Sequence, residues 1–224
     1  MSIRYLARAS VRGFLAASLA LLLGNSAAHA AFVTIDEPGL DAVFSQKSFG
    51  NKPIDVVIRP TRELNAPHLL EIDDQYDLNE VYSFSTASKP AIGMLFVDSI
   101  TYCDGYGHTI IGCGWIGDSG TIVESVFSAS SKGTSLQAHE IGHTLGLTHT
   151  ERGLMEPYNH GSLELTRREA RKIHLSDLVQ KDRDGHFIEI SPYVVTAVPI
   201  PASGLLLLGG VMALVAGSRL RRTA

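Results

Sequence analysis

Apolar residues occupy two different kinds of position along the chain. Between residues 31 and 195 they form short segments separated by proline, glycine and acidic residues, a pattern typical of a globular domain with a buried core. At the two ends they form continuous runs, residues 14–23 and 204–217, with arginines close by. The pattern therefore predicts one folded domain between two terminal segments of a different kind.

Several interior segments have the composition of strands or turns. Residues 54–59 and 121–127 are rich in β-branched residues and predict two strands, and the apolar segment 92–99 predicts a third that is buried on both faces. The acidic segment 71–80 fits a loop as well as a helix. Residues 182–185, Asp-Arg-Asp-Gly, lack the full spacing of an EF-hand calcium loop and predict a tight turn.

Three further segments predict helices. Residues 38–46 place their larger apolar side chains on one side of a short helix. A second helix is expected to begin near Thr134, because Thr134 and Gln137 have the spacing of a capping box. Thr166 and Glu169 repeat that spacing and predict the start of a third helix.

The amino-terminal segment 1–30 has the order of a secretory signal peptide. Three arginines precede the apolar run 14–23, and small residues then lead to Ala28, His29 and Ala30, an A-x-A cleavage pattern. A retained membrane anchor is the alternative, but the apolar run is short for a membrane span. We expect cleavage after Ala30, and hence an exported domain over residues 31–195.

The carboxyl-terminal segment 196–224 has three parts. Pro199 and Pro201 mark the start of a helix over the apolar run 204–217, and a cluster of arginines follows it. Basic residues after such a run favour a cytoplasmic end, with the body of the protein outside. The segment therefore predicts a short transmembrane helix and contact with the membrane through this segment alone.

This tail resembles a PEP-CTERM sorting signal in its Val-Pro-x-Pro-Ala form, with Ile200 where that signal often has Glu or Leu. The resemblance implies processing by an exosortase-type enzyme and a place on the cell surface or in the extracellular matrix of a Gram-negative bacterium, anchored in the inner membrane transiently or permanently. A plain carboxyl-terminal membrane anchor is the alternative. Both interpretations predict export.

The charge of the interior domain narrows the possible partners. All 23 acidic residues lie between Asp36 and Glu189, whereas six of the 19 basic residues are arginines of the terminal segments. The interior therefore carries 13 basic against 23 acidic residues, a formal charge of −10. An acidic domain of this kind is a poor candidate for binding nucleic acid or anionic lipid.

The strongest chemical pattern is His139-Glu140-x-x-His143-x-x-Gly146-x-x-His149. Residues four apart share one face of a helix, so His139 and His143 can bind one metal ion while Glu140 flanks it. Gly146 permits a sharp turn that ends the helix and brings His149 back as a third ligand. Three protein ligands leave one position of tetrahedral Zn²⁺ open for water, which is typical of catalytic zinc; buried structural histidines are the alternative.

A glycine-dense segment, residues 101–120, contains both cysteines. Cys103 and Cys113 lie in the exported part and are expected to form a disulfide, with metal ligation as the alternative. We interpret the segment as a disulfide-tied hairpin or edge strand above the metal, where an extended peptide could pair with it. A glycine-rich surface loop without a substrate role fits nearly as well.

The histidine pattern resembles the metzincin metallopeptidases, and Met155 in Gly-Leu-Met-Glu-Pro resembles their Met-turn. The resemblance implies an α+β fold with a twisted, mostly parallel sheet packed on the active-site helix. It also implies a small carboxyl-terminal lobe with one further helix, and Met155 as a floor beneath the metal. Astacin-like and serralysin-like members have a tyrosine two residues after the methionine, whereas this chain has Pro157 followed by Tyr158.

These patterns together predict an exported zinc endopeptidase acting on proteins or peptides, with His139, His143 and His149 as zinc ligands and Glu140 as general base. A cell-wall peptide hydrolase would use the same zinc chemistry. A non-catalytic surface or matrix protein with a structural zinc is the third possibility.

Overall fold

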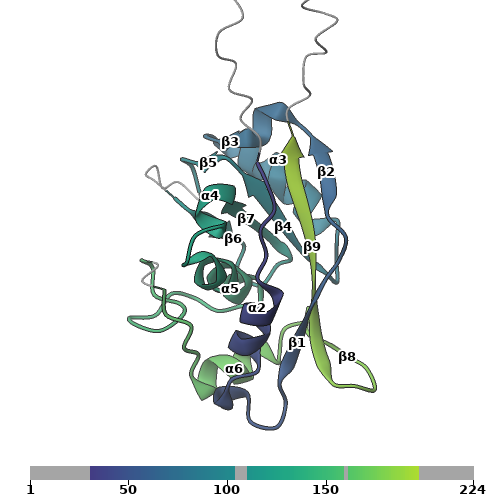
Figure 1. Cartoon of the computed structure of the whole chain (residues 1–224), viewed down its shortest axis with the longest axis vertical. Coiled ribbons are helices and arrows are strands. Elements are labelled where there is room, and N and C mark those ends of the chain that lie inside the picture. Colours follow the sequence, from purple (N-terminus) through teal and green to yellow (C-terminus); the bar gives the residue numbers. More distant parts are fainter. Residues whose placement is uncertain (1–30, 104–109, 159–160, 197–224) are drawn as a thin grey trace, which may run out of the picture.

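A computed structural model describes residues 31–103, 110–158 and 161–196 (Figure 1). The predicted signal peptide, 1–30, and almost all of the predicted sorting segment, 196–224, lie outside these residues. Both therefore stay predictions.

Seven strands of the described chain form one sheet with the order β1-β9-β4-β7-β6 and two strands beside β9. The central strands β1 (Ile54–Ile58), β9 (His186–Thr196), β4 (Ile92–Val97) and β7 (Gly120–Glu124) pair in parallel. The edge strand β6 (Gly112–Gly114) is antiparallel to β7, β2 (Arg62–Asn65) extends the β1 side, and β8 (Gln180–Lys181) pairs antiparallel with β9. This confirms the prediction of a mixed α+β fold with a mostly parallel sheet.

Helices lie on both faces of the sheet (Figure 1). One hydrophobic core contains residues of α2 (Glu37–Phe44), α5 (Gly133–Thr144) and α6 (Arg167–Ile173); the other contains residues of α3 (Gln75–Thr86). All six residues of β4 are buried, and they alternate between the cores. Met94 and Phe96 join the first core and Leu95 the second, as expected for a strand covered on both faces.

Shorter elements complete the described fold. The 3₁₀ helices η1 (Lys47–Phe49) and η2 (Pro67–Leu70) follow α2 and β2. Strands β3 (Glu71–Ile72) and β5 (Ser99–Ile100) form a small parallel pair, and α4 (Ser125–Ser128) follows β7 directly. The predicted strand 121–127 therefore ends early, because its last residues turn into this helix.

Strand β9, next to the sheet centre, was not predicted from the sequence. Its middle contains Pro192, which would remove a ladder hydrogen bond in an ordinary central strand. Here β9 pairs with β1 up to Ile190 and with β2 from Tyr193. The carbonyl of Ile190 accepts from the backbone nitrogen of Arg59 on that side (2.8 Å). Alternate residues of a strand direct their backbone groups to the same side, so the nitrogen of Pro192 faces the gap between the end of β1 and the start of β2. A proline is tolerated there because neither strand pairs with it.

The side chains at the starts of α5 and α6 bind different partners: those of α6 bond to residues three apart, and those of α5 bond to residues far away in the sequence. At α6 the capping box of Thr166 and Glu169 is present, as predicted. At α5 the predicted capping box is wrong: the helix begins at Gly133 after Lys132, without a side-chain cap. Thr134 donates instead to Asp36 (2.7 Å), and Gln137 donates to the carbonyl of Thr34 (2.6 Å).

Two other predictions are resolved by local hydrogen bonds. Asp74 accepts from the backbone of Tyr76 and Asp77 and caps α3, so the ambiguous acidic segment contains a helix start. Asp182 accepts from the backbone nitrogens of Asp184 and Gly185 and forms the predicted turn.

The prediction of a membrane-spanning helix needs correction. Among the described residues no helix is both long enough and apolar enough to cross a membrane. The segment that suggested one, residues 204–217, lies outside the described chain. The short helices seen here pack their apolar sides into the two cores instead.

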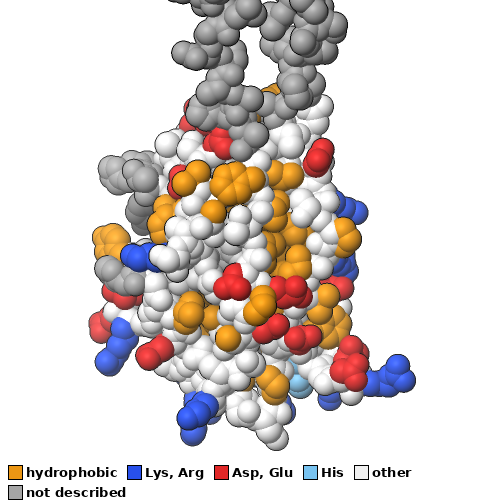
Figure 2. All heavy atoms as spheres, in the orientation of Figure 1, with side chains coloured by type: hydrophobic (Ala, Val, Ile, Leu, Met, Phe, Trp, Pro, Cys, Tyr) orange, Lys and Arg blue, Asp and Glu red, His pale blue; other side chains and the backbone are white. Residues whose placement is uncertain are grey.

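The acidic balance of the sequence is visible on the surface. In Figure 2 acidic side chains gather near the centre of the face, where α2 and β1 lie in Figure 1, and basic ones lie mostly at its outline. Asp41 on α2 and Asp55 on β1 line a pocket of about 710 Å³ there. Burial, followed by the charge of Asp55, raises the pKa of Asp41.

Candidate metal centre

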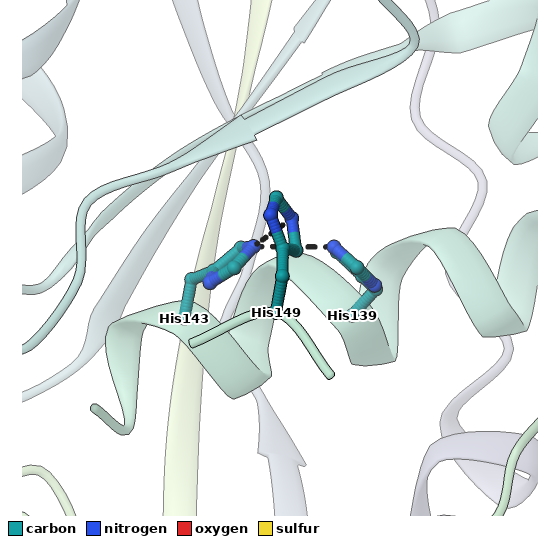
Figure 3. A group of neighbouring side chains, drawn as sticks. All are labelled: His139, His143 and His149. Carbon is teal, nitrogen blue, oxygen red and sulfur yellow. Dashed lines mark hydrogen bonds between the residues drawn. The ribbon is translucent and has the colours of Figure 1, made fainter. Parts of the chain in front are cut away.

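The helix α5 places two of the predicted ligands one turn apart. His139 and His143 are both buried, and their rings rise from the same side of the helix (Figure 3). His149 belongs to the segment after the helix and is exposed. The predicted ligand set therefore has two ligands fixed in the protein body and one at the solvent side.

The return of the chain to His149 depends on a Schellman motif at the end of α5. Gly146 has a φ of +93°, its nitrogen donates to the carbonyl of His143 (2.8 Å), and Leu147 donates to the carbonyl of Gly142 (2.8 Å). This pair of bonds satisfies the last carbonyls of a helix and needs a left-handed residue, which glycine supplies without strain. Gly146 thus ends the helix as predicted.

The three imidazole rings point toward a common centre (Figure 3). Nε2 of His143 lies 3.1 Å from Nε2 of His139 and 3.2 Å from Nε2 of His149. One ligand nitrogen from each ring can be chosen so that all three lie within 4.8 Å of one another. Zn–N bonds of about 2.0–2.1 Å in tetrahedral geometry place two nitrogens about 3.3 Å apart. The donor set therefore fits a zinc ion.

Hydrogen bonds on the far sides of two rings fix which nitrogen carries the proton. Nδ1 of His139 lies 2.7 Å from the carbonyl oxygen of Leu154, and Nδ1 of His143 lies 2.9 Å from that of Leu147. A carbonyl oxygen can only accept, so each Nδ1 donates. Each Nε2 then keeps its lone pair for a metal, the arrangement that second-shell partners usually enforce.

Burial keeps these rings neutral. It lowers the pKa of His139 to about 4, with further lowering by His143 and His149 and an opposing effect of the bond to Leu154. Burial also lowers the pKa of His143. Neutral imidazole is the form that binds metal, so both ligands are ready at neutral pH without releasing a proton.

Glu140 lies next to the ligand His139 and beneath the edge strand. Its side chain is buried, and this desolvation raises its pKa to about 8. A Cβ atom on Gly112 would lie 2.6 Å from Oε1 of Glu140, which shows how closely β6 approaches the carboxyl group. The predicted general base is therefore held between the metal-binding helix and the edge of the sheet.

Met155 packs under the same helix. It is fully buried, and a Cβ on Gly142 would lie 2.5 Å from its Sδ, so a side chain at position 142 would require the end of Met155 to shift. The backbone nitrogen of Thr150 donates to the carbonyl of Met155 (2.9 Å) and closes the loop that follows His149. Met155 thus packs against the helix at Gly142, and its role as a floor beneath a metal stays a prediction.

The two cysteines form the predicted disulfide. Cys113 is the middle residue of β6, and the bond ties this edge strand to Cys103, which follows β5. The glycine-dense segment is therefore an edge strand beside the metal centre, not a free surface loop, although residues 104–109 lie outside the described chain.

Among the other described histidines, His174 is not part of the group formed by His139, His143 and His149. His174 packs against Phe49, lies 5.0 Å from His186 between ring centroids, and its Nε2 donates to the carbonyl of Lys52 (3.0 Å). Tyr158 is 76% exposed. His160 falls outside the described residues.

Sequence reasoning missed the backbone part of the site. The carbonyls of Leu147 and Leu154 carry no signal in the residue types themselves, because any residue supplies a carbonyl. Gly112 and Gly114 did give a signal in the sequence, because glycines at alternate positions of a strand leave one face of it without side chains. That pattern indicates a close approach of another element.

Comparison with known proteins adds no assignment. No protein-family model matches the chain, and no curated protein matches it. The interpretation of the site therefore depends on the geometry and on the motif.

Proposed function

We propose that this protein is an exported zinc-dependent endopeptidase of the metzincin type, with His139, His143 and His149 as ligands. The observation that carries the proposal is the convergence of three imidazole rings with the Nδ1–H of both buried ones held by backbone carbonyls. A structural site usually adds a fourth protein ligand, whereas a catalytic site leaves that position open. The exposure of His149 supports access from solvent.

The role of each residue follows from its position. Zinc bound by the three histidines supplies Lewis-acid chemistry and lowers the pKa of water. Glu140 removes a proton from the attacking water as the water oxygen bonds to the peptide carbonyl carbon. It returns a proton to the amine nitrogen as the C–N bond breaks. A cation beside Glu140 favours its ionised form, which opposes the effect of burial on its pKa.

Several features of the fold support the metzincin resemblance. The order of mostly parallel strands, histidine-bearing helix, glycine turn, buried methionine and one further helix is consistent with that plan. The resemblance implies a small carboxyl-terminal lobe with one further helix. The helix α6 is present, but the chain after it returns to the main sheet as β9. Tyr158, which does not occupy the position of the tyrosine ligand in astacin-like members, receives no catalytic role.

We also propose that the domain acts outside the cytoplasm. The disulfide between Cys103 and Cys113 suits an oxidising compartment. The signal-peptide pattern of residues 1–30 and the sorting-signal pattern of the tail support export to the cell surface or matrix, with an exosortase-type enzyme as processing partner. Cleaved and uncleaved forms of the exported protein can be told apart by mass.

A peptide pool tests the proposal directly. The zinc-loaded protein is incubated with a diverse set of peptides, with and without a chelator, and new termini are identified by mass spectrometry. We expect cleavage that stops with the chelator and returns with added zinc. Purified peptidoglycan and a casein-type substrate, assayed side by side, separate a cell-wall hydrolase from a general endopeptidase. Absence of hydrolysis in all three assays, with zinc bound, contradicts the proposal and indicates a structural zinc.

A further inference from the structure

The edge strand β6 approaches the metal-binding helix α5 more closely than side chains would allow. A Cβ on Gly112 would lie 2.6 Å from Oε1 of Glu140 and 2.8 Å from both its Cγ and its Cδ. A Cβ on Gly114 would lie 2.8 Å from the carbonyl oxygen of Glu140 and 3.0 Å from its Oε2. Real Cβ atoms essentially never come this close, so a side chain at position 112 would require the carboxyl end of Glu140 to shift, and one at position 114 would meet the backbone carbonyl of Glu140.

The alternation of the strand explains why the contact is confined to one face. Gly112 and Gly114 face α5, and Cys113 between them belongs to the second core, on the other side of the sheet. The disulfide to Cys103 holds the strand from that side, and Thr121 on the neighbouring strand donates to the carbonyl of Cys113 (3.3 Å). The face toward Glu140 is therefore bare backbone, pressed against the carboxyl group.

The end of β6 is tied to the same helix. Gly117, in the turn after the strand, donates to the carbonyl of His143 (3.0 Å), and a Cβ on Gly114 would lie 3.1 Å from Cβ of His143. The strand thus contacts α5 at the general base and at a metal ligand, one turn apart. Movement of β6 would change the space available to Glu140.

We propose that Gly112 and Gly114 are positioning residues that hold the side chain of Glu140 in one orientation between β6 and α5. The bare face of β6 leaves the carboxyl group only the space between strand and helix, so its direction is set by packing. The steric part of this inference stands on the contacts alone, whereas its catalytic consequence rests on the proposed function.

Glycines elsewhere in the sheet provide a matched control. A Cβ on Gly120, at the start of the neighbouring strand β7, would lie 2.4 Å from Oγ of Ser85, on α3. Gly120→Ala therefore introduces a clash of the same kind in the adjacent strand, directed at a serine rather than at Glu140. Its effect should be independent of what occupies position 140.

A double-mutant cycle on thermal stability tests the contact without any need for activity. Gly112→Ala is measured in the full chain, with Glu140 and with Glu140→Ala, and Gly120→Ala is measured in the same two backgrounds. We expect Gly112→Ala to lower the midpoint of unfolding by several degrees when residue 140 is glutamate and by much less in the Glu140→Ala background, because the three nearest atoms to the added Cβ lie beyond Cβ of Glu140. Gly120→Ala should have the same effect in both, as distant sites do.

Equal effects of Gly112→Ala in both backgrounds overturn the proposal. If the single variant Gly112→Ala does not fold, recovery of folding by Glu140→Ala is the expected result, and failure to fold in both backgrounds overturns it. Neither result depends on peptide hydrolysis, so this experiment and the peptide assay fail independently.

The kinetic test then examines the positioning role in folded, zinc-loaded protein. We expect Gly112→Ala to lower kcat by about 10²-fold, since small displacements of a catalytic group have effects of that size, with little change in KM or zinc content. Gly120→Ala should retain normal kcat at a temperature where it is folded. A normal kcat for Gly112→Ala contradicts the positioning role even if the cycle shows coupling.

Discussion

Nδ1 of His139 donates a hydrogen bond to the carbonyl oxygen of Leu154 at 2.7 Å. This bond joins the first ligand of the metal helix to the residue directly before Met155, so the ligand ring and the loop beneath it are fixed together. The same bond sets the tautomer of His139 and leaves Nε2 for the metal. The site is thereby formed by the fold before any metal arrives.

The assignment of His149 as third ligand predicts a loss of zinc affinity in His149→Ala. Removal of a second-shell partner typically weakens metal binding by 10-fold to 100-fold, so loss of a ligand should cost more than about 10²-fold. Zinc competition with a chromophoric chelator measures it. His174→Ala is the matched control and should bind zinc normally, because His174 packs against Phe49 elsewhere. Normal zinc affinity in His149→Ala would show that His149 is not the third ligand, and His160 would be tested next.

The packing of Met155 predicts an effect on stability. Met155→Ala removes a fully buried side chain from beneath Gly142 and should lower the free energy of unfolding by about 2–5 kcal/mol. Chemical denaturation of the zinc-free protein measures this cost. Met155→Leu keeps most of the volume and should cost less than about 1.5 kcal/mol. Similar stability of the alanine variant and the unchanged protein would show that the loop is not packed under the helix.

The disulfide predicts a dependence on redox conditions. Replacing Cys103 and Cys113 by serine opens a loop with a sequence separation of 10 and should lower the free energy of unfolding by about 2–4 kcal/mol. A reductant should destabilise the unchanged protein by a similar amount and leave the double variant unaffected. Denaturation curves with and without reductant measure both. An unchanged midpoint on reduction contradicts this expectation.

Asp118 predicts a pH-dependent contribution to stability. Partial burial would raise its pKa, but hydrogen bonds from Lys89 and Tyr82 outweigh this effect and hold the pKa below the ordinary value of 3.8. A lowered pKa means that the stabilisation is present above pH 3.8 and is lost as the pH falls through the folded-state value.

Asp118→Asn should therefore lower the free energy of unfolding by about 1–3 kcal/mol at pH 7, and the difference should shrink toward pH 3. Denaturation of both proteins across that pH range measures it. A difference that stays constant down to pH 3 contradicts the role of the ionised carboxylate.

The placement of His139 and His143 on one face of a helix could be predicted from the sequence because helical periodicity is local. Four-residue spacing places His139 and His143 on one face whatever the rest of the chain does, and the capping box at Thr166 likewise depends on residues three apart. A glycine after the helix indicated its end for the same reason. These features need no knowledge of distant contacts.

The features that sequence reasoning missed depend on residues far apart along the chain. Thr134 and Gln137 have capping-box spacing, but they bind Asp36 and the carbonyl of Thr34, which lie 98 and 103 residues away. Strand β9 contains a proline that is tolerated only because two other strands meet beside it. The alternating glycines Gly112 and Gly114 could be recognised in the sequence. Their contact with Glu140 could not, because it joins residues that are distant along the chain.

The proposed function depends most on Glu140 acting as the base of a zinc site formed by three histidines. Zinc content and peptide hydrolysis of Glu140→Gln, measured side by side with the unchanged protein, test it most directly. The claim predicts that the variant retains its zinc, because no ligand is altered, and loses hydrolysis by about 10²-fold to 10⁴-fold or more. A variant that retains zinc and hydrolyses peptides at a near-normal rate would contradict it.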